Sequence, residues 1–329
     1  MKVLAKRNIP SSPTCLFADE GSIYILKDEK DKFMLILISP EDLSTSDISS
    51  FEGSVHPYSD PAVDENMVYI PLQTGQILAL DKYSLEPVYL TERDLSFVMS
   101  HLSVAGNSLV YLCGIPLADI RRQTTDAYFI RTLEKATGET ISKSKMIRGS
   151  ISSMEANGDF YLVCDRMMTR FRLDNTVEIG GRAGLTPQGS PIVTSTKVAI
   201  YGQNGVLQLF NKADLSKAGH LQSDKTISRP YIDEQENGYW FTTTSIYAID
   251  INRCSSVRMS ELKKQTMSDP VFWNDRLYAS SYDGHVIEFN PYNQQVDFLQ
   301  LTHGPLSRPY LMENSLVFWC DDTISKVIS

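Results

Sequence analysis

The sequence lacks the runs and motifs that mark a membrane span or a familiar catalytic centre. No stretch approaches the roughly 18 consecutive apolar residues of a membrane-spanning helix. There is no G-x-S-x-G, no phosphate-binding loop, no G-x-G-x-x-G and no HExxH. The five histidines are too widely spaced for a local metal motif. We therefore predict no catalytic residues, no metal and no cofactor.

The chain has only five cysteines, and its 31 basic residues are outnumbered by 40 acidic ones. The five cysteines form no CxxC pair, and several lie in apolar runs, where cysteine behaves as a small hydrophobic residue. The N-terminal segment MKVLAKRNIPSS lacks the apolar core of a signal peptide. We therefore expect reduced thiols and a cytoplasmic location. The formal net charge of −9 argues against direct contact with nucleic acid, and we expect no membrane contact.

The sequence does contain a repeat of about 40 residues. The prolines at 191, 230, 270 and 309 are 39, 40 and 39 residues apart. Each copy has a short apolar segment after the proline, a polar turn, an apolar run often containing Tyr, a second turn, and two further strand-like runs. The copy SDPVFWNDRLYASSYDGHVIEFNPY at 268–292 shows this pattern most clearly. Alternation with period 2 between Gly, Asn and Asp turns indicates strands and hairpins.

Four short strands in each unit, with no helical pattern between them, are typical of a propeller blade. Eight starts are visible, but the last copy has only three strands. We expect residues 1–9 to supply its fourth strand and to close the ring, which removes the open sheet edges. The sequence predicts one all-β domain over 1–329, an eight-bladed β-propeller of four-stranded antiparallel blades. The predicted blades are 12–52, 57–95, 99–147, 150–186, 189–226, 228–266, 268–305 and 307–329.

Seven blades is the alternative, because the copy at Ser12 lacks a clean proline anchor.

The unit resembles the pyrroloquinoline-quinone-type (PQQ-like) propeller repeat, whose consensus runs Pro-x-Val, Asp-Gly, Val-Tyr-Val, Asp-Gly, Ala-Leu-Asp, then Gly and Trp. The resemblance is strongest over 57–95 and 189–329. It implies the fold, and it leaves the function open: some members are quinone-dependent dehydrogenases, and others, such as the outer-membrane assembly lipoprotein, are non-catalytic. This chain lacks the docking Trp and vicinal Cys pair of the enzymes and the lipobox Cys of the lipoprotein. We therefore expect a non-enzymatic member without a signal peptide.

The residue before each anchor is expected to lie at the start of the innermost strand, next to the central channel. We single out the charged and histidine members as candidates for binding a partner or ligand: Asp60, His101, Arg229, Asp269 and Arg308. One interpretation is a ring of mutually compensating charges at the channel mouth. The other is a site for a polar ligand or peptide.

The copy that starts at Ser100 is interrupted. Residues 114–126, which include Arg121 and Arg122, replace a short turn between its second and third strands. Such a loop would share a face with the starts of the inner strands. Long loops in compact domains are often functional, although drift in a tolerant loop is the alternative.

The leading hypothesis is a non-catalytic scaffold for protein–protein interaction, acting as a subunit of a multi-protein system. Its partner would bind the face that carries Arg121, Arg122 and the channel residues. The alternative is a small-ligand-binding or enzymatic propeller, of the quinone-dependent oxidoreductase or lyase type, with a site at the channel mouth. It requires Asp60, Arg229, Asp269 and Arg308 to converge on a cavity rather than on one another.

Overall fold

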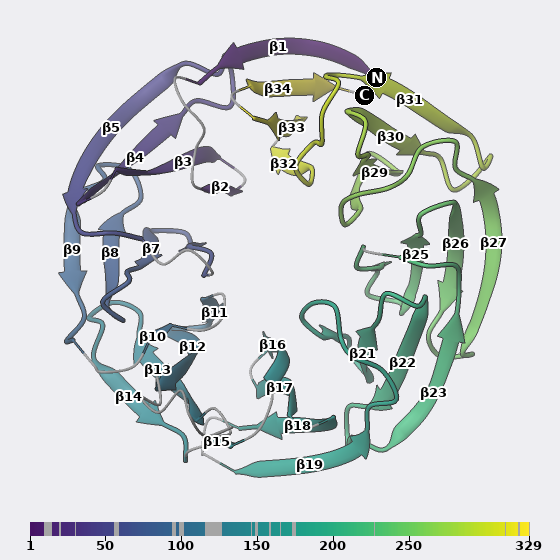
Figure 1. The fold of residues 1–329 in the computed structure, drawn as a ribbon, viewed down its shortest axis with the longest axis horizontal. Coiled ribbons are helices and arrows are strands. Elements are labelled where there is room, and N and C mark those ends of the chain that lie inside the picture. Colours follow the sequence, from purple (N-terminus) through teal and green to yellow (C-terminus); the bar gives the residue numbers. More distant parts are fainter. Residues whose placement is uncertain are drawn as a thin grey trace, which may run out of the picture.

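In the computed structural model the chain forms a ring of eight antiparallel sheets around a central channel (Figure 1). The predicted eight-bladed, all-β propeller is confirmed, and the described residues contain no helix. It follows that no described helix is long and apolar enough to cross a membrane. The structure describes residues 1–9, 15–19, 21–29, 31–55, 59–93, 97–98, 102–115, 127–145, 147–148, 151–157, 159–164, 166–172, 176–226, 228–312, 314–321 and 323–328.

The first four blades follow one another along the chain, each running from the channel outwards. Blade 1 comprises β2 (Cys15–Asp19), β3 (Ser22–Glu29), β4 (Lys32–Ile38) and β5 (Thr45–Glu52); blade 2 comprises β6 (Ala62–Val63), β7 (Met67–Pro71), β8 (Ile77–Asp81) and β9 (Pro87–Leu90); blade 3 comprises β10 (Phe97–Val98), β11 (Ser103–Ala105), β12 (Ser108–Ile115), β13 (Ala127–Glu134), β14 (Thr140–Lys143) and β15 (Ile147–Arg148); blade 4 comprises β16 (Ile151–Asn157), β17 (Asp159–Cys164), β18 (Met167–Phe171) and β19 (Val177–Arg182).

The last four blades repeat the same order, and their inner strands have two or three residues. Blade 5 comprises β20 (Ile192–Val193), β21 (Lys197–Tyr201), β22 (Val206–Asn211) and β23 (Lys217–Gln222); blade 6 comprises β24 (Tyr231–Ile232), β25 (Asn237–Phe241), β26 (Ser245–Asp250) and β27 (Ser255–Glu261); blade 7 comprises β28 (Val271–Trp273), β29 (Arg276–Ser280), β30 (His285–Phe289) and β31 (Val296–Gln300); blade 8 comprises β32 (Tyr310–Met312), β33 (Ser315–Cys320), β34 (Thr323–Ile328) and β1 (Lys2–Asn8).

Blade 3 departs from the regular pattern. Its inner edge is divided between β10 and β11, which both pair with β12, and β15 adds to β13 beside β14. Strands β12 and β13 pair as far as Ile115 opposite Ala127. The connection between the second and third strands of this blade is therefore residues 116–126, and these lie outside the described residues.

Blade 8 is closed by the first strand of the chain, as the sequence predicted. Strand β1 pairs antiparallel with β34, with Lys2 opposite Ile328 and Asn8 opposite Thr323. It also ties the neighbouring blades together. The Lys6 ammonium donates to the carbonyl of Leu301, 2.6 Å away, after blade 7, and the Arg7 guanidinium donates to the carbonyl of Leu43 in blade 1. Both ends of the chain therefore lie together in one sheet (Figure 1).

The hydrophobic core consists of layers between blades. The buried apolar residues of the described chain fall into eight clusters, each joining two neighbouring blades. The tyrosine that recurs in the second strands fills these layers and is fully buried at Tyr24, Tyr69, Tyr111, Tyr161 and Tyr278. The recurrent Tyr of the sequence therefore reports packing between blades.

The serine that opens several copies forms a buried latch. The Ser268 hydroxyl accepts the backbone N–H of Ser280 at 2.9 Å, and the Ser307 hydroxyl accepts that of Trp319 at the same distance. Ser268 is buried, so no water can replace the bond. The latch fixes the start of the inner strand against the second strand and so sets the position of the channel residue next to it.

We expect Ser268→Ala to lower the free energy of unfolding by about 1 to 3 kcal/mol, because it leaves the buried N–H of Ser280 without an acceptor. Denaturant unfolding of the purified protein measures the change. Ser255→Ala, at an exposed position of β27, is the matched control and is expected to change stability by less than about 0.5 kcal/mol. Equal losses in the two variants would contradict the latch.

Candidate functional site

The topology brings the starts of the inner strands to one side of the disc. In each antiparallel blade the connection between the second and third strands lies on that same side, because successive strands reverse direction. We call this side the channel-mouth face; it carries the residues just before β6, β24, β28 and β32 and the turns such as 202–205 and 281–284. The first-to-second and third-to-fourth turns form the opposite face.

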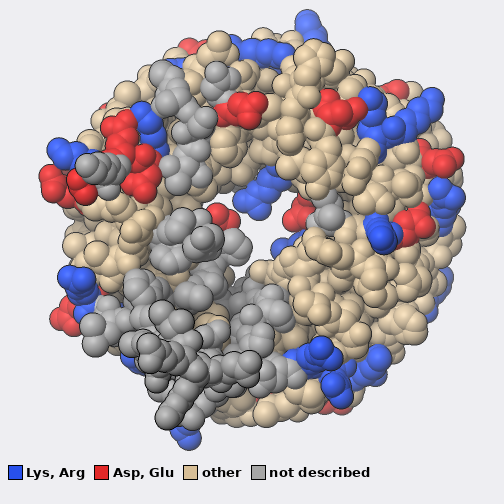
Figure 2. Space-filling view, viewed as in Figure 1, with Lys and Arg blue, Asp and Glu red and all other residues tan. Residues whose placement is uncertain are grey.

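The structure places four predicted site residues on this face. Asp60, Arg229, Asp269 and Arg308 each precede their inner strand by two residues. The intervening prolines 230, 270 and 309 are buried, so they anchor the backbone while their neighbours point along the channel wall. Figure 2 shows basic side chains inside the channel with acidic side chains on either side.

Asp269 and Arg229 meet across the junction of blades 6 and 7. The backbone N–H of Arg229 donates to the Asp269 carboxylate at 2.5 Å, and the Arg229 guanidinium donates to the carbonyl of Pro191 at 3.1 Å. Burial raises the pKa of Asp269 above its ordinary value, and the bond from Arg229 and the charges of Arg229 and Arg308 oppose that rise. The carboxylate is thus already engaged by the protein.

Arg308 links the acidic groups of blades 2 and 7. Its guanidinium experiences the charges of both Asp60 and Asp269 and lies 5.2 Å from the centre of the Tyr310 ring. The Tyr310 hydroxyl donates to the carbonyl of Leu16 at 2.7 Å, which holds the ring against blade 1. Two acidic and two basic side chains therefore lie at the channel mouth, and we call Asp60, Arg229, Asp269 and Arg308 the channel-mouth charges.

Cys15 lies within reach of the same charges. Burial, reinforced by the negative charge of Asp60 and opposed by Arg308, raises the pKa of the Cys15 thiol to about 12. A thiol that stays protonated at neutral pH is a poor nucleophile. Cys15 therefore behaves as a packing residue, consistent with the five free cysteines.

Sequence reasoning identified the four charges but missed their aromatic neighbour. Tyr310 directly follows an anchor proline, where the repeat predicts only a short apolar segment. The predicted site residues His101, Arg121 and Arg122, and segment 116–126 as a whole, lie outside the described residues. Their roles remain predictions.

His285 is the first residue of β30 and directly follows an Asp-Gly turn. Its imidazole Nδ1 lies 3.0 Å from the Asp283 carboxylate, and its ring meets the edge of Phe298. Gly284 has a φ of +83°, and a Cβ there would lie 2.2 Å from the carbonyl oxygen of Thr302. Glycine at position 284 is therefore required by the turn.

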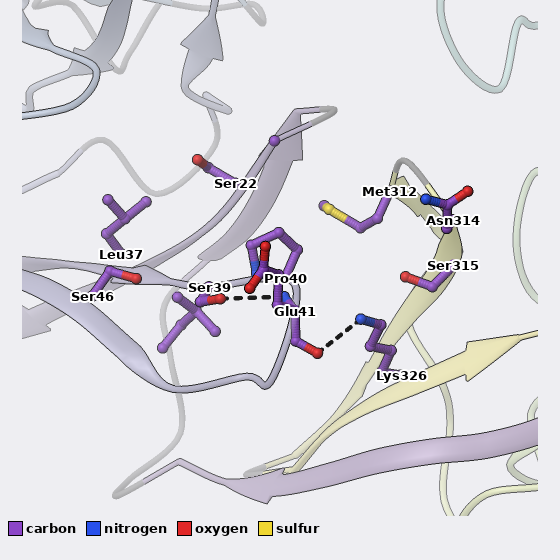
Figure 3. A pocket seen from close by; sticks show the side chains of 12 residues that line it. Ser22, Leu37, Ser39, Pro40, Glu41, Ser46, Met312, Asn314, Ser315 and Lys326 are labelled. Atoms are coloured by element: carbon purple, nitrogen blue, oxygen red, sulfur yellow. Dashed lines mark hydrogen bonds between the residues drawn. The ribbon is translucent and has the colours of Figure 1, made fainter.

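The seam between blades 1 and 8 contains a separate cavity of about 440 Å³ on the opposite face (Figure 3). Its lining is mostly neutral and polar, and Met312 and Leu37 supply apolar walls. The Lys326 ammonium crosses the seam and donates to the carbonyl of Glu41 at 2.9 Å. The only lining cation of this cavity thus helps to close the ring.

The described residues contain no group of three or more His, Cys, Asp or Glu side chains that could hold a metal ion. The channel-mouth charges include only two carboxylates, and each lies beside an arginine.

The comparisons with known proteins support the fold. No protein-family model matches the chain, and no curated protein matches it by sequence. Among solved structures, BamB from Moraxella catarrhalis is similar, with a TM-score of 0.69 and 13% identity, over 99% of this chain and 96% of BamB. Sqt1 from Saccharomyces cerevisiae has a TM-score of 0.70 and 12% identity, over 99% and 98%. A europium-containing methanol dehydrogenase has a TM-score of 0.62 and 10% identity, over 95% and 84%.

The fold is that of an eight-bladed β-propeller. The low identities limit the likeness to architecture. These likenesses therefore assign no function to this propeller.

Proposed function

We propose that this propeller is a non-catalytic, cytoplasmic scaffold that binds a protein partner through its channel-mouth face, as a subunit of a multi-protein system. A closed ring of eight blades is compatible with such a role, because it holds loops from many separate segments in fixed relative positions. The five free cysteines support a reducing compartment.

The observation that carries the proposal is the arrangement of the channel-mouth charges. The Asp269 carboxylate accepts a hydrogen bond from the backbone N–H of Arg229, and the Arg308 guanidinium lies near the charges of Asp60 and Asp269. Opposite charges that lie beside one another compensate each other, and this arrangement supports a structural rim. Asp60 and Arg308 nevertheless remain exposed, so a partner can contact them.

The alternative is a small-ligand or enzymatic site at the channel mouth. The raised pKa of Asp269 is the observation in its favour, because perturbed carboxyls are common at functional sites. Purified protein that carries a bound chromophore or metal would support this alternative. We favour the scaffold, because the Asp269 carboxylate already accepts the Arg229 N–H.

A charge-swap experiment tests the proposal. In Asp60→Lys/Arg308→Glu the net charge is unchanged but the pattern at the channel mouth is reversed. We expect partners captured from cell extract by the wild-type protein to be retained at least tenfold less by this variant, because misplaced charges disfavour association. Quantitative mass spectrometry of the captured proteins measures the effect.

The control swaps an exposed ion pair on the rim, Arg258→Glu/Glu261→Lys in β27. It is expected to retain the same partners as the wild type. The proposal fails if the wild type captures no specific partner, or if the channel-mouth swap leaves both the partners and the cellular role intact.

A further inference from the structure

The junction of blades 4 and 5 carries an open groove that extends from the channel-mouth face to the outer strands β19 and β23. It consists of two adjoining cavities of about 600 and 390 Å³, which share Leu185 and Thr186 in the connection from β19 to β20. Three cationic side chains line one end, and three side-chain amides line the other. We call this feature the basic groove; its polar residues are Arg166, Arg182, Lys217, Gln188, Gln203 and Asn204.

Within the part of the chain that the structure describes, the cations of the groove have no acidic partners. Arg166, Arg182 and Lys217 are exposed, none of the described lining residues is Asp or Glu, and no ion pair joins these three cations to any described residue. Figure 2 shows a group of basic side chains over the junction of β18–β19 with β22–β23. The chain has a net charge of −9, so the charge of these groove residues is opposite in sign to that of the whole protein.

The backbone beneath the cations is held rigidly. The N–H of Ala183 donates to the carbonyl of Arg166 at 2.6 Å. The buried side chain of Gln208 accepts the N–H of Gly184 at 2.6 Å and donates to the carbonyl of Arg182 at 3.1 Å. The two arginines therefore project from fixed points, which reduces the entropy lost when a ligand binds.

The amide end of the groove offers groups suited to a peptide backbone. The backbone N–H of Gln188 donates to the carbonyl of Tyr201 at 2.9 Å. The side-chain oxygen of Gln188 is buried and has no hydrogen-bond partner among the described residues. Gln203 and Asn204 lie opposite in the turn between β21 and β22. The side-chain amides of Gln203 and Asn204 are exposed, so they can donate to and accept from the backbone of a ligand.

We propose that the basic groove binds an extended acidic segment of a partner protein. Its carboxylates pair with Arg166, Arg182 and Lys217, and its backbone amides bond with the side-chain amides at the other end. A single small anion is a poorer fit, because the cations are exposed at one end of an open groove rather than enclosing a cavity. This inference rests on the proposed function, since it names the chemistry of the partner that the face receives.

The test measures binding of a fluorescein-labelled decaglutamate peptide to the full-length protein by anisotropy. We expect binding that weakens as salt is raised and that is at least tenfold weaker for Arg166→Glu/Arg182→Glu. The control is Arg253→Glu/Lys263→Glu, which makes the same charge change at exposed positions and is expected to bind like the wild type. Thermal unfolding of each variant establishes that it is folded.

Three outcomes overturn the inference. One is no binding of decaglutamate, and another is equal weakening in both double variants. The third is binding of inorganic phosphate or pyrophosphate that displaces the peptide at equal concentration, which identifies a small-anion site instead. If captured cellular partners are lost from the channel-mouth swap but retained by Arg166→Glu/Arg182→Glu, the scaffold stands and only the basic groove is rejected.

Discussion

Deletion of residues 2–8 is expected to lower the free energy of unfolding by about 3 to 6 kcal/mol and to increase self-association. These residues form β1, which makes six registered residue pairs with β34. At roughly 1 kcal/mol for each backbone hydrogen bond, the lost pairing alone gives an effect of this size. Val3 and Ala5 also pack into the layers on either side of blade 8.

The deletion leaves β34 as an unpaired edge. Such an edge is a template for pairing with another chain, so the truncated protein should associate as its concentration rises. Denaturant unfolding and light scattering measure the two effects. Leu4→Ser, which changes an exposed side chain of β1 without removing the strand, is expected to leave both unchanged. A truncated protein with wild-type stability would show that β1 does not close the ring.

Glu236→Ala is expected to lower the free energy of unfolding by about 2 to 3 kcal/mol. Glu236 lies in the turn between β24 and β25 and is buried. Its carboxylate accepts the Thr196 N–H at 2.7 Å and the hydroxyls of Thr194, Ser195 and Thr196, all in the corresponding turn of blade 5. Removing the carboxylate takes this acceptor away from the donors. It also removes a contact between blades 5 and 6 on the face opposite the channel mouth.

The stability that this contact of Glu236 provides should depend on pH. Burial acts to raise the pKa of Glu236, but the bonds from Thr194, Thr196 and Ser195 outweigh it and lower the pKa from 4.5 to about 2. Because the pKa of Glu236 is lower in the folded state, its charged carboxylate stabilises the protein above pH 4.5. This contribution to the free energy of unfolding is lost as the pH falls from 4.5 through 2. The stability difference between wild type and Glu236→Gln should therefore be largest near pH 7, remain no greater than that of Glu236→Ala, and shrink below pH 4.5.

The neighbouring carboxylate provides the control. Glu234 lies in the same turn but is exposed, so Glu234→Ala should change stability by less than about 0.5 kcal/mol at any pH. A difference between wild type and Glu236→Gln that stays constant from pH 7 to pH 3 would contradict a charged, hydrogen-bonded Glu236.

The repeat allowed the ring to be predicted because its markers are local. The proline spacing, the second-strand tyrosines and the Gly turns each reflect the local structure of one blade. Because this pattern recurs eight times, it predicts a ring of eight blades. The channel residues Asp60, Arg229, Asp269 and Arg308 could be found for the same reason, since each has a fixed offset from its proline. The division of the inner edge of blade 3 has no such marker.

Contacts between blades could not be predicted in this way. In the sequence, DEQEN at 233–237 is an ordinary polar turn, and nothing distinguishes Glu236 from Glu234 until blade 5 is placed beside it. The basic groove is similar. Arg166, Arg182 and Lys217 come from three separate segments, and each reads alone as a solvated surface charge.

The pairing of β1 with β34 also has a consequence for the order of folding. Asn8 and Thr323 are 315 residues apart, and their side chains are hydrogen-bonded in the finished ring. Local hairpins can form within each blade as it leaves the ribosome, but this contact must await nearly the whole chain. Until then the nascent protein is an open arc with β1 unpaired. Synthesis past residue 328, rather than hairpin formation, should therefore set the earliest time at which the molecule becomes resistant to proteolysis.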